Sequence, residues 1–194
     1  MTLIDNVNSD SREKDDVNDH LSVVLAKDDI RDLVVRLARA MDRNDRQGIL
    51  DCYHPGAVDH HGEFEGPVEE LVDFIDLLHR ERADTMYHLL GNHLITLDGD
   101  RGLGELYITA VLRAKAGPPA DMIAGGRYLD HYQRRDGQWR LAERRVVLDW
   151  QRFDPVVDFP GIATVAVQER GSAGVADPSC RHLAGGEALG GRVR

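Results

Sequence analysis

Histidine and glutamate side chains gather in one short segment, AVDHHGEFEGP, and raise the question of a metal site. The segment contains His60, His61, Glu63 and Glu65. Adjacent histidines on an extended strand point to opposite faces, so His60 and His61 make a poor chelating pair. We therefore expect no metal here. We expect instead that one of the two histidines lines the mouth of a ligand pocket.

Four aromatic side chains with a polar end could orient a ligand: Tyr53, Tyr107, Tyr128 and Trp150. Such residues also fill hydrophobic cores, so the core interpretation stays open for each of them. The Gly125-Gly126 pair lacks the spacing of a dinucleotide-binding loop and predicts a bulge or bend in a strand. The sequence contains no nucleophile elbow, phosphate-binding loop or cysteine–histidine motif.

Arg144 is a candidate for holding an anion or a leaving group, because its guanidinium presents several donors in a fixed fork. It alternates with Ala142, Val146, Leu148 and Trp150, so it is predicted to share a strand face with apolar residues. An arginine that points inward in such company needs a partner. Its neighbours Glu143 and Arg145 would point the other way.

Three helices are predicted in the first half of the chain. Apolar residues from Ile30 to Met41 recur with helical spacing, and Asp42 flanks this apolar stripe rather than opposing it. A short helix follows at about 45–53, with Asp45 as its N-cap. A third helix begins at Pro67 and carries acidic residues early and basic residues late.

The second half of the chain predicts strands. A near-continuous apolar strand is predicted over 85–97, and further strands are predicted over 103–114, 122–135 and 139–153. The turns between them are Asp98-Gly99-Asp100, a proline-containing turn and Asp136-Gly137. Such turns join antiparallel strands in hairpins. We therefore predict an α+β fold: a curved antiparallel sheet, made of a four-strand meander and a short N-terminal strand or hairpin, packed on three N-terminal helices.

Composition places this domain between two tails. The chain has 194 residues, of which 42% are hydrophobic and 30% charged, and its net charge is −10. Half of that charge lies within residues 1–29, and we expect residues 1–25 to form a disordered acidic leader. The domain is predicted over 26–160, and the glycine-rich segment 161–194 is predicted to be a mobile tail. The acidic body argues against nucleic-acid binding, and no apolar run is long enough for a membrane span, so we expect a cytoplasmic protein.

The order of helices and strands, together with several short motifs, resembles the SnoaL-like branch of the nuclear-transport-factor-two-like superfamily. The motifs are RAMDRND, FEGP, TMYHLLGN, GGRYLDHYQRRDGQWRLAERR and VVLDW, within about residues 25–155. The resemblance implies a cone formed by a curved sheet and helices, with a pocket at its open end. The superfamily includes dehydratases, isomerases, cyclases and non-catalytic binding proteins, so the fold alone does not define the activity.

The aspartate–histidine dehydratases and the dehydrochlorinase of this branch supply the site prediction. Asp42 and His88 fall on the positions of their catalytic aspartate and histidine, and Arg144 falls on a pocket arginine of the dehydrochlorinase. Glu105 lies where some relatives carry another acid or a histidine. Leu37 departs from the pattern, because several relatives have a lysine or tyrosine five residues before the aspartate.

The resemblance implies a cofactor-independent lyase of the dehydratase type, or an isomerase or cyclase, acting on a hydrophobic small molecule. His88 would be the general base, Asp42 would orient it, and Arg144 would stabilise the leaving group. The alternative is a non-catalytic small-molecule-binding or assembly subunit. A distance beyond about 4–5 Å between the Asp42 and His88 side chains would favour that alternative. Relatives cover their open sheet face by forming homodimers or homotrimers, and the same is expected here.

Overall fold

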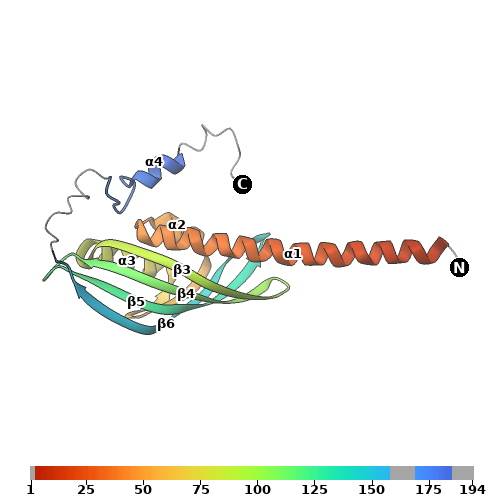
Figure 1. Ribbon diagram of the computed structural model, residues 1–194, viewed down its shortest axis with the longest axis horizontal. Coiled ribbons are helices and arrows are strands. Elements are labelled where there is room, and N and C mark those ends of the chain that lie inside the picture. The colour runs from red at the N-terminus through yellow and green to blue at the C-terminus, as the bar shows by residue number, and fades with distance from the viewer. Residues whose placement is uncertain (1–2, 158–168, 185–194) are drawn as a thin grey trace.

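The computed structural model describes residues 3–157 and 169–184, and it contains one curved sheet with helices on its concave side (Figure 1). The sheet has six strands in the order β2-β1-β6-β5-β4-β3. The strands are β1 (Tyr53–His61), β2 (Phe64–Pro67), β3 (Ala83–Asp98), β4 (Arg101–Ala114), β5 (Ala120–Arg135) and β6 (Gln138–Pro155). Strand β1 runs parallel to β6, and all other neighbours are antiparallel.

The predicted meander is β3–β6, and the predicted N-terminal hairpin is β1–β2, so the α+β prediction is confirmed. The sheet is mixed and not wholly antiparallel as predicted, because β1 pairs with β6 in parallel. The tight turn between β5 and β6 shows why the hairpin signal was reliable. Both central residues, Asp136 and Gly137, have positive φ angles, 51° and 77°. Such turns match the right-handed twist of the strands they join and favour the Asp-Gly pair.

The helices are α1 (Leu3–Asp42), α2 (Arg46–Asp51) and α3 (Val68–Leu77), and α3 continues into a π-helical turn, η1 (Leu78–Arg82). The apolar stripe of α1 is buried against the sheet and the other helices, with Ile30 and Leu37 fully inaccessible. The Asp45 side chain accepts a hydrogen bond from the Gly48 amide at 3.0 Å and caps α2, as predicted.

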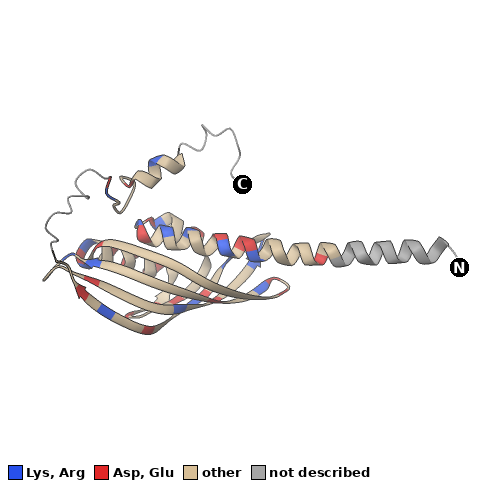
Figure 2. Cartoon of the chain, in the orientation of Figure 1, with Lys and Arg blue, Asp and Glu red and all other residues tan. Residues whose placement is uncertain are grey.

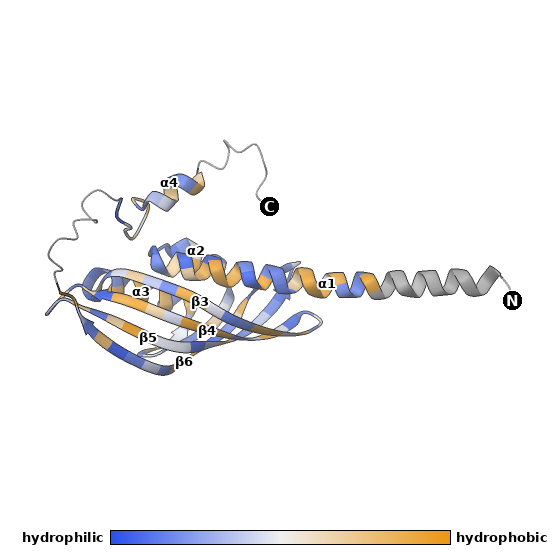
Figure 3. Ribbon diagram, in the orientation of Figure 1, coloured by the Kyte–Doolittle hydropathy of each residue, from blue (hydrophilic) through white to orange (hydrophobic). Residues whose placement is uncertain are grey.

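The N-terminal part of the chain differs from the expected disordered leader. Residues 3–25 are helical and continue α1, which projects beyond the sheet (Figure 1). Apolar residues continue into this projecting part, as Figure 3 shows, and Val17, Leu21 and Val24 are more than half exposed. The folded domain has already nucleated α1, and extending a nucleated helix adds one hydrogen bond for each residue that is fixed, so helical structure here needs no core of its own.

The glycine-rich C-terminal segment is not wholly a free tail. Residues 169–184 lie against the end of α1 and include α4 (Pro178–Ala184), whereas 161–168 and 185–194 lie outside the described residues. Asp177 is buried and lies 3.2 Å from the Arg43 side chain, and the Gly174 amide donates to the Arg43 carbonyl at 2.6 Å. These specific polar contacts, rather than apolar burial, hold the segment.

Acidic and basic residues are mixed along α1 and the strands in Figure 2. Within the part of the chain that the structure describes, no helix is both long enough and apolar enough to cross a membrane.

Candidate active site

Asp42, the last residue of α1, and His88, in the first half of β3, lie side by side. The His88 Nδ1 atom lies 2.6 Å from Asp42 Oδ1, and the His88 backbone amide donates to Asp42 Oδ2 at 3.1 Å. Both side chains are about nine-tenths buried or more. The carboxylate is therefore held at both oxygens by one residue. It fixes the proton of the neutral imidazole on Nδ1 and leaves Nε2 as the free base.

His88 contributes to the wall of a cavity of about 420 Å³ between the concave face of the sheet and α3. This volume is in the range of small-molecule sites. Most of the wall is apolar and includes Phe74, Ile75, Met86, Ile108, Leu112 and Phe153. Such a wall suits a hydrophobic ligand and strengthens polar interactions at the few polar groups it contains.

His61 is the second histidine of the cavity wall. It ends β1, and its ring packs against that of Tyr128 with centroids 6.2 Å apart. Its Nδ1 atom lies 3.5 Å from Oδ1 of Asp59, and Asp59 Oδ2 accepts a hydrogen bond from the Tyr53 hydroxyl at 2.5 Å. Burial raises the pKa of Tyr53, and the Asp59 carboxylate adds to the effect, so the phenol remains a donor.

Arg144 is not where the resemblance placed it. It is buried behind Tyr128, with its guanidinium 4.0 Å from the centre of that ring, and it does not line the cavity. Asp130 holds it through two hydrogen bonds of 2.7 Å. Burial alone would lower the pKa of Arg144, but the Asp130 carboxylate, together with Tyr53 and Tyr128, raises it above its usual value. The expected partner exists, and it occupies the Nε and Nη2 donors of the guanidinium.

The other predicted ligand-binding residues divide between cavity and surface. Tyr128 lines the cavity, whereas Tyr53 is buried beneath it as the donor to Asp59. His60 lies on the opposite face of β1, between Glu65 and Glu143. Glu105 bonds to Arg127 on the outer face of the sheet. Of the two adjacent histidines, His61 lines the cavity and His60 does not.

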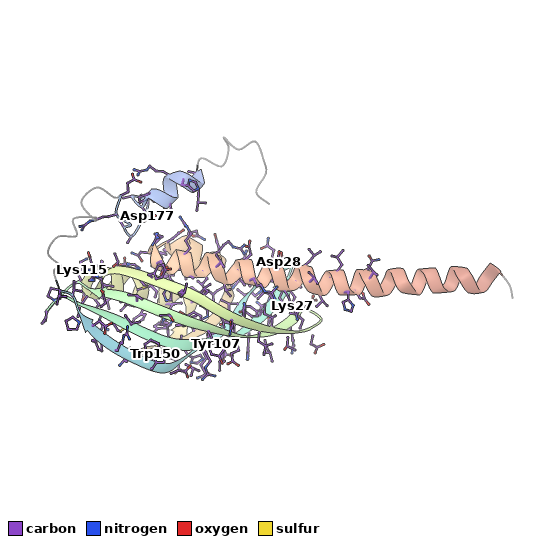
Figure 4. All side chains as sticks on the ribbon, in the orientation of Figure 1. Lys27, Asp28, Tyr107, Lys115, Trp150 and Asp177 are labelled. Atoms are coloured by element: carbon purple, nitrogen blue, oxygen red, sulfur yellow. The ribbon has the colours of Figure 1, made fainter. Side chains whose placement is uncertain are left out.

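Tyr107 and Trp150 also lie on the outer face of the sheet, away from α1, and each is 49% exposed (Figure 4). The prediction failed at Trp150 because β6 contains an extra residue there. Gly126 pairs with Leu148 and Gly125 with Trp150, so Asp149 forms a β-bulge. One extra residue reverses which side chains face inward, and Gln151 replaces Trp150 at the cavity.

Sequence reasoning missed two aspartates that organise the inner face. Asp59 stands two residues before His61, and period-two alternation puts both on one face of the strand. Asp130 alternates with Tyr128 and Tyr132 on β5, and it pairs directly across from Arg144. The inward position of Asp59 could therefore have been predicted from the alternation of residues along the strand. The Asp130–Arg144 pair required the register between β5 and β6.

Leu37, which stands where several relatives have a lysine or tyrosine, is fully buried in the core. This position therefore gives the cavity no polar group. Arg82 is a polar residue of the cavity wall that was not predicted, and its guanidinium bonds to Glu63 at 2.8 Å. Both side chains are more than half exposed, so they form the rim of the cavity.

Comparison with solved structures gives the same fold. A hexachlorocyclohexane dehydrochlorinase (LinA, type 2) superposes with a TM-score of 0.66 at 17% identity, over 74% of this chain and 99% of that one. A candidate scytalone dehydratase from Novosphingobium aromaticivorans gives 0.60 at 14% identity, over 79% and 95%. A protein of unknown function from Mycobacterium tuberculosis gives 0.55 at 24% identity, over 85% and 93%.

No curated protein sequence matches the chain. The model of the SnoaL-like domain matches residues 22–145, which cover α1 from its exposed part onward, most of the cavity wall and most of the sheet. With this match and the six-stranded architecture together, the chain belongs to the SnoaL-like family.

Proposed function

We propose that the protein is a cofactor-independent lyase of the dehydratase type, acting on a hydrophobic small molecule with His88 as its general base. The observation that carries the proposal is the 2.6 Å contact between His88 Nδ1 and Asp42 Oδ1 at the wall of an apolar cavity. This distance is well inside the limit beyond which a non-catalytic binding role would be favoured.

The chemistry begins with removal of a proton from a carbon next to an activating group, such as a carbonyl. His88 Nε2 takes this proton, and Asp42 stabilises the imidazolium that forms. The apolar wall excludes water from the base and strengthens its pairing with the carboxylate. Loss of a leaving group from the neighbouring carbon then completes an elimination. Reprotonation at another carbon would instead give an isomerisation.

The structural relatives support elimination over isomerisation. One is named a dehydrochlorinase and another a candidate dehydratase, and both names describe loss of a small molecule from neighbouring carbons. Elimination is therefore the reaction to test first on this chain.

The base can be tested without knowing the natural leaving group. We expect the protein to exchange the α-hydrogens of 1-tetralone, a hydrophobic bicyclic ketone, for deuterium in D₂O, as measured by NMR. His88→Gln should slow exchange by roughly 10²–10⁴-fold. Asp42→Asn should also slow it, because an amide oxygen turned to the His88 backbone N–H would present its NH₂ to Nδ1 and shift the imidazole proton to Nε2.

His60→Gln provides the matched control, since this histidine lies on the opposite face of β1 and contacts Glu65 and Glu143 rather than the cavity. The His60→Gln variant should exchange the α-hydrogens of 1-tetralone as fast as the parent protein does. Parent-level exchange in His88→Gln and Asp42→Asn, with both variants folded by circular dichroism, would refute the proposed base.

A further inference from the structure

The cavity has a second histidine–aspartate pair, built entirely from β1. Asp59 and His61 are two residues apart on one strand and share a face. Asp59 is fully inaccessible to solvent, and His61 contributes to the cavity wall. No part of the base mechanism described above uses this pair.

The two side chains have complementary unfilled hydrogen-bonding capacity. Asp59 Oδ1 and His61 Nδ1 are both buried, and neither has a hydrogen-bond partner among the described residues. They lie 3.5 Å apart, so each is positioned to satisfy the other after a small movement of the imidazole ring. A buried carboxylate oxygen left unpaired is costly, so this contact is favoured whenever the ring carries a proton on Nδ1.

The buried position of Nδ1 determines what His61 offers to a ligand. The His61 side chain is 21% exposed, and Nδ1 is on its buried side. The opposite edge of the ring, which carries Nε2, therefore faces the cavity. Tyr53 holds Asp59 from behind through its 2.5 Å hydrogen bond, and the Tyr128 ring supports the imidazole from β5.

The sheet topology places the two histidines on opposite walls of the cavity. His61 comes from β1 and His88 from β3, and β6, β5 and β4 lie between these two strands in the curved sheet (Figure 1). A ligand between them can thus be approached from two sides. In an anti elimination the proton and the leaving group depart from opposite faces of the substrate.

We propose that His61 is the general acid of the reaction, that Asp59 positions it, and that it protonates a departing hydroxyl group while His88 removes the proton. The inference rests on the proposed function. The C–H electron pair forms the new C=C bond, and its proton goes to His88 Nε2. The C–O electron pair leaves with oxygen, which takes the proton from His61 Nε2 and departs as water. Proton exchange with solvent then restores a neutral His88 and a protonated His61.

Leaving groups of different basicity separate the two roles. Hydroxide is a poor leaving group and needs a proton, whereas chloride leaves without one. Rates are compared after subtraction of the uncatalysed reaction. We expect His61→Gln to slow elimination of water from 3-hydroxy-1-tetralone by roughly 10²-fold or more. The same variant should slow elimination of HCl from 3-chloro-1-tetralone by only a few-fold. His88→Gln should slow both, and His60→Gln should slow neither.

The outcomes distinguish the two proposals. Equal slowing of both substrates by His61→Gln, or no slowing of either, would overturn the role of His61 and leave the base in place. A third outcome also overturns elimination through His61. In it, His61→Gln and the parent protein exchange the α-hydrogens of 1-tetralone at the same rate, but the parent protein eliminates neither water nor HCl. If the parent protein does not exchange the α-hydrogens of 1-tetralone at all, the proposed function itself is overturned.

A measurement without substrate tests the positioning by Asp59. In ¹⁵N NMR spectra, neutral His61 should carry its proton on Nδ1 in the parent protein. Asp59→Asn should move the proton to Nε2, because Tyr53 would hold the amide oxygen and turn the NH₂ toward the ring. A parent His61 with its proton already on Nε2 would contradict the arrangement, whether or not the variant folds.

Discussion

The Asp42–His88 and Asp130–Arg144 pairs are alike in chemistry and opposite in access. Each joins a buried aspartate to a nitrogen base or cation from another element, at 2.6 and 2.7 Å. His88 reaches the cavity, whereas Arg144 is sealed behind the ring of Tyr128. Burial and pairing are therefore common to a structural and a candidate catalytic group. Access to the cavity is what separates them.

The Asp42–His88 and Asp130–Arg144 pairs also differ in whether they can exchange a proton. The Asp130 carboxylate raises the pKa of an arginine that is already charged at every physiological pH, so this pair cannot exchange a proton. The imidazole next to Asp42 has a ring nitrogen, Nε2, that can take a proton and return it. The first pair is suited to holding strands together, and the second to chemistry.

The largest expected effect is a loss of stability when the Asp130–Arg144 pair is broken. Asp130→Ala leaves a buried guanidinium without a counterion and should lower the free energy of unfolding by about 3–5 kcal/mol in urea denaturation. Asp42→Ala should cost less, about 1–3 kcal/mol, because it removes hydrogen bonds without stranding a permanent charge. Equal costs at the two positions would remove the distinction between the pairs.

A double variant serves as the control for this comparison. Asp130→Leu combined with Arg144→Met replaces the ion pair with apolar side chains and should recover most of the lost stability. Failure to recover it would mean that the cost came from packing around Tyr128 and Tyr132, which contact the pair, and not from the unpaired charge.

A smaller effect is expected at the end of α1 that carries Asp42. Asp177 clamps the C-terminal segment there, and hydrogen bonds from the Ser179 hydroxyl and the Ser172 amide lower its pKa below the usual 3.8. A lowered pKa stabilises the clamp above pH 3.8, and this contribution is lost as the pH falls below that value toward the folded-state pKa. Asp177→Asn should therefore weaken the clamp at pH 7 and have a smaller effect in acid.

Hydrogen exchange of the Gly174 amide, which bonds to the Arg43 carbonyl, reports on the clamp. At pH 7 we expect about tenfold less protection in Asp177→Asn than in the parent protein. The difference should shrink below pH 3.8. A difference independent of pH would show that the aspartate acts through packing and not through its charge.

The smallest effect is expected at a third ion pair, on the outer face of the sheet. Arg127 makes two hydrogen bonds to Asp149, at 2.9 and 3.0 Å, and both side chains are partly exposed. Solvent screens such pairs, so Arg127→Gln should not measurably change the urea midpoint of a monomer. The homodimer or homotrimer that the family resemblance implies would cover this pair if it used the outer face. A loss of stability that depends on protein concentration, together with a lower mass in light scattering, would reveal that assembly.

Strand and helix positions followed from the sequence because they depend on local patterns. The apolar stripe of α1, the Asp45 cap and the Asp136-Gly137 turn each carry their signal within a few residues. The helical N-terminal extension did not follow, because the prediction of a disordered leader rested on its acidic, polar composition. The docked segment 169–184 did not follow, because no apolar pattern marks it. Asp177 holds the latter through contacts with residues more than a hundred positions away.

For the site, the residue types near Asp42 and His88 were enough to propose a base through the family resemblance, and the structure brings the two side chains together. Tyr107 was misassigned because it alternates with the buried Leu106 and Ile108 on β4 and so faces outward. The assignments of Arg144 and Trp150 failed for reasons of register and access. A single bulged residue, Asp149, turned Trp150 to the outer face, and the cross-strand partner Asp130 occupied Arg144.

The sequence by itself determined the α+β order of elements, the apolar stripe that builds the core and the chemical types of the candidate groups. These depend on periodicity and composition, which are local properties of the chain. Only the tertiary structure decided which groups meet. It joined Asp42 to His88, sealed Arg144 with Asp130, and placed His61 opposite His88 across one cavity. Strand register and sheet curvature bring distant residues within hydrogen-bonding distance, and neither can be read from a segment of sequence alone.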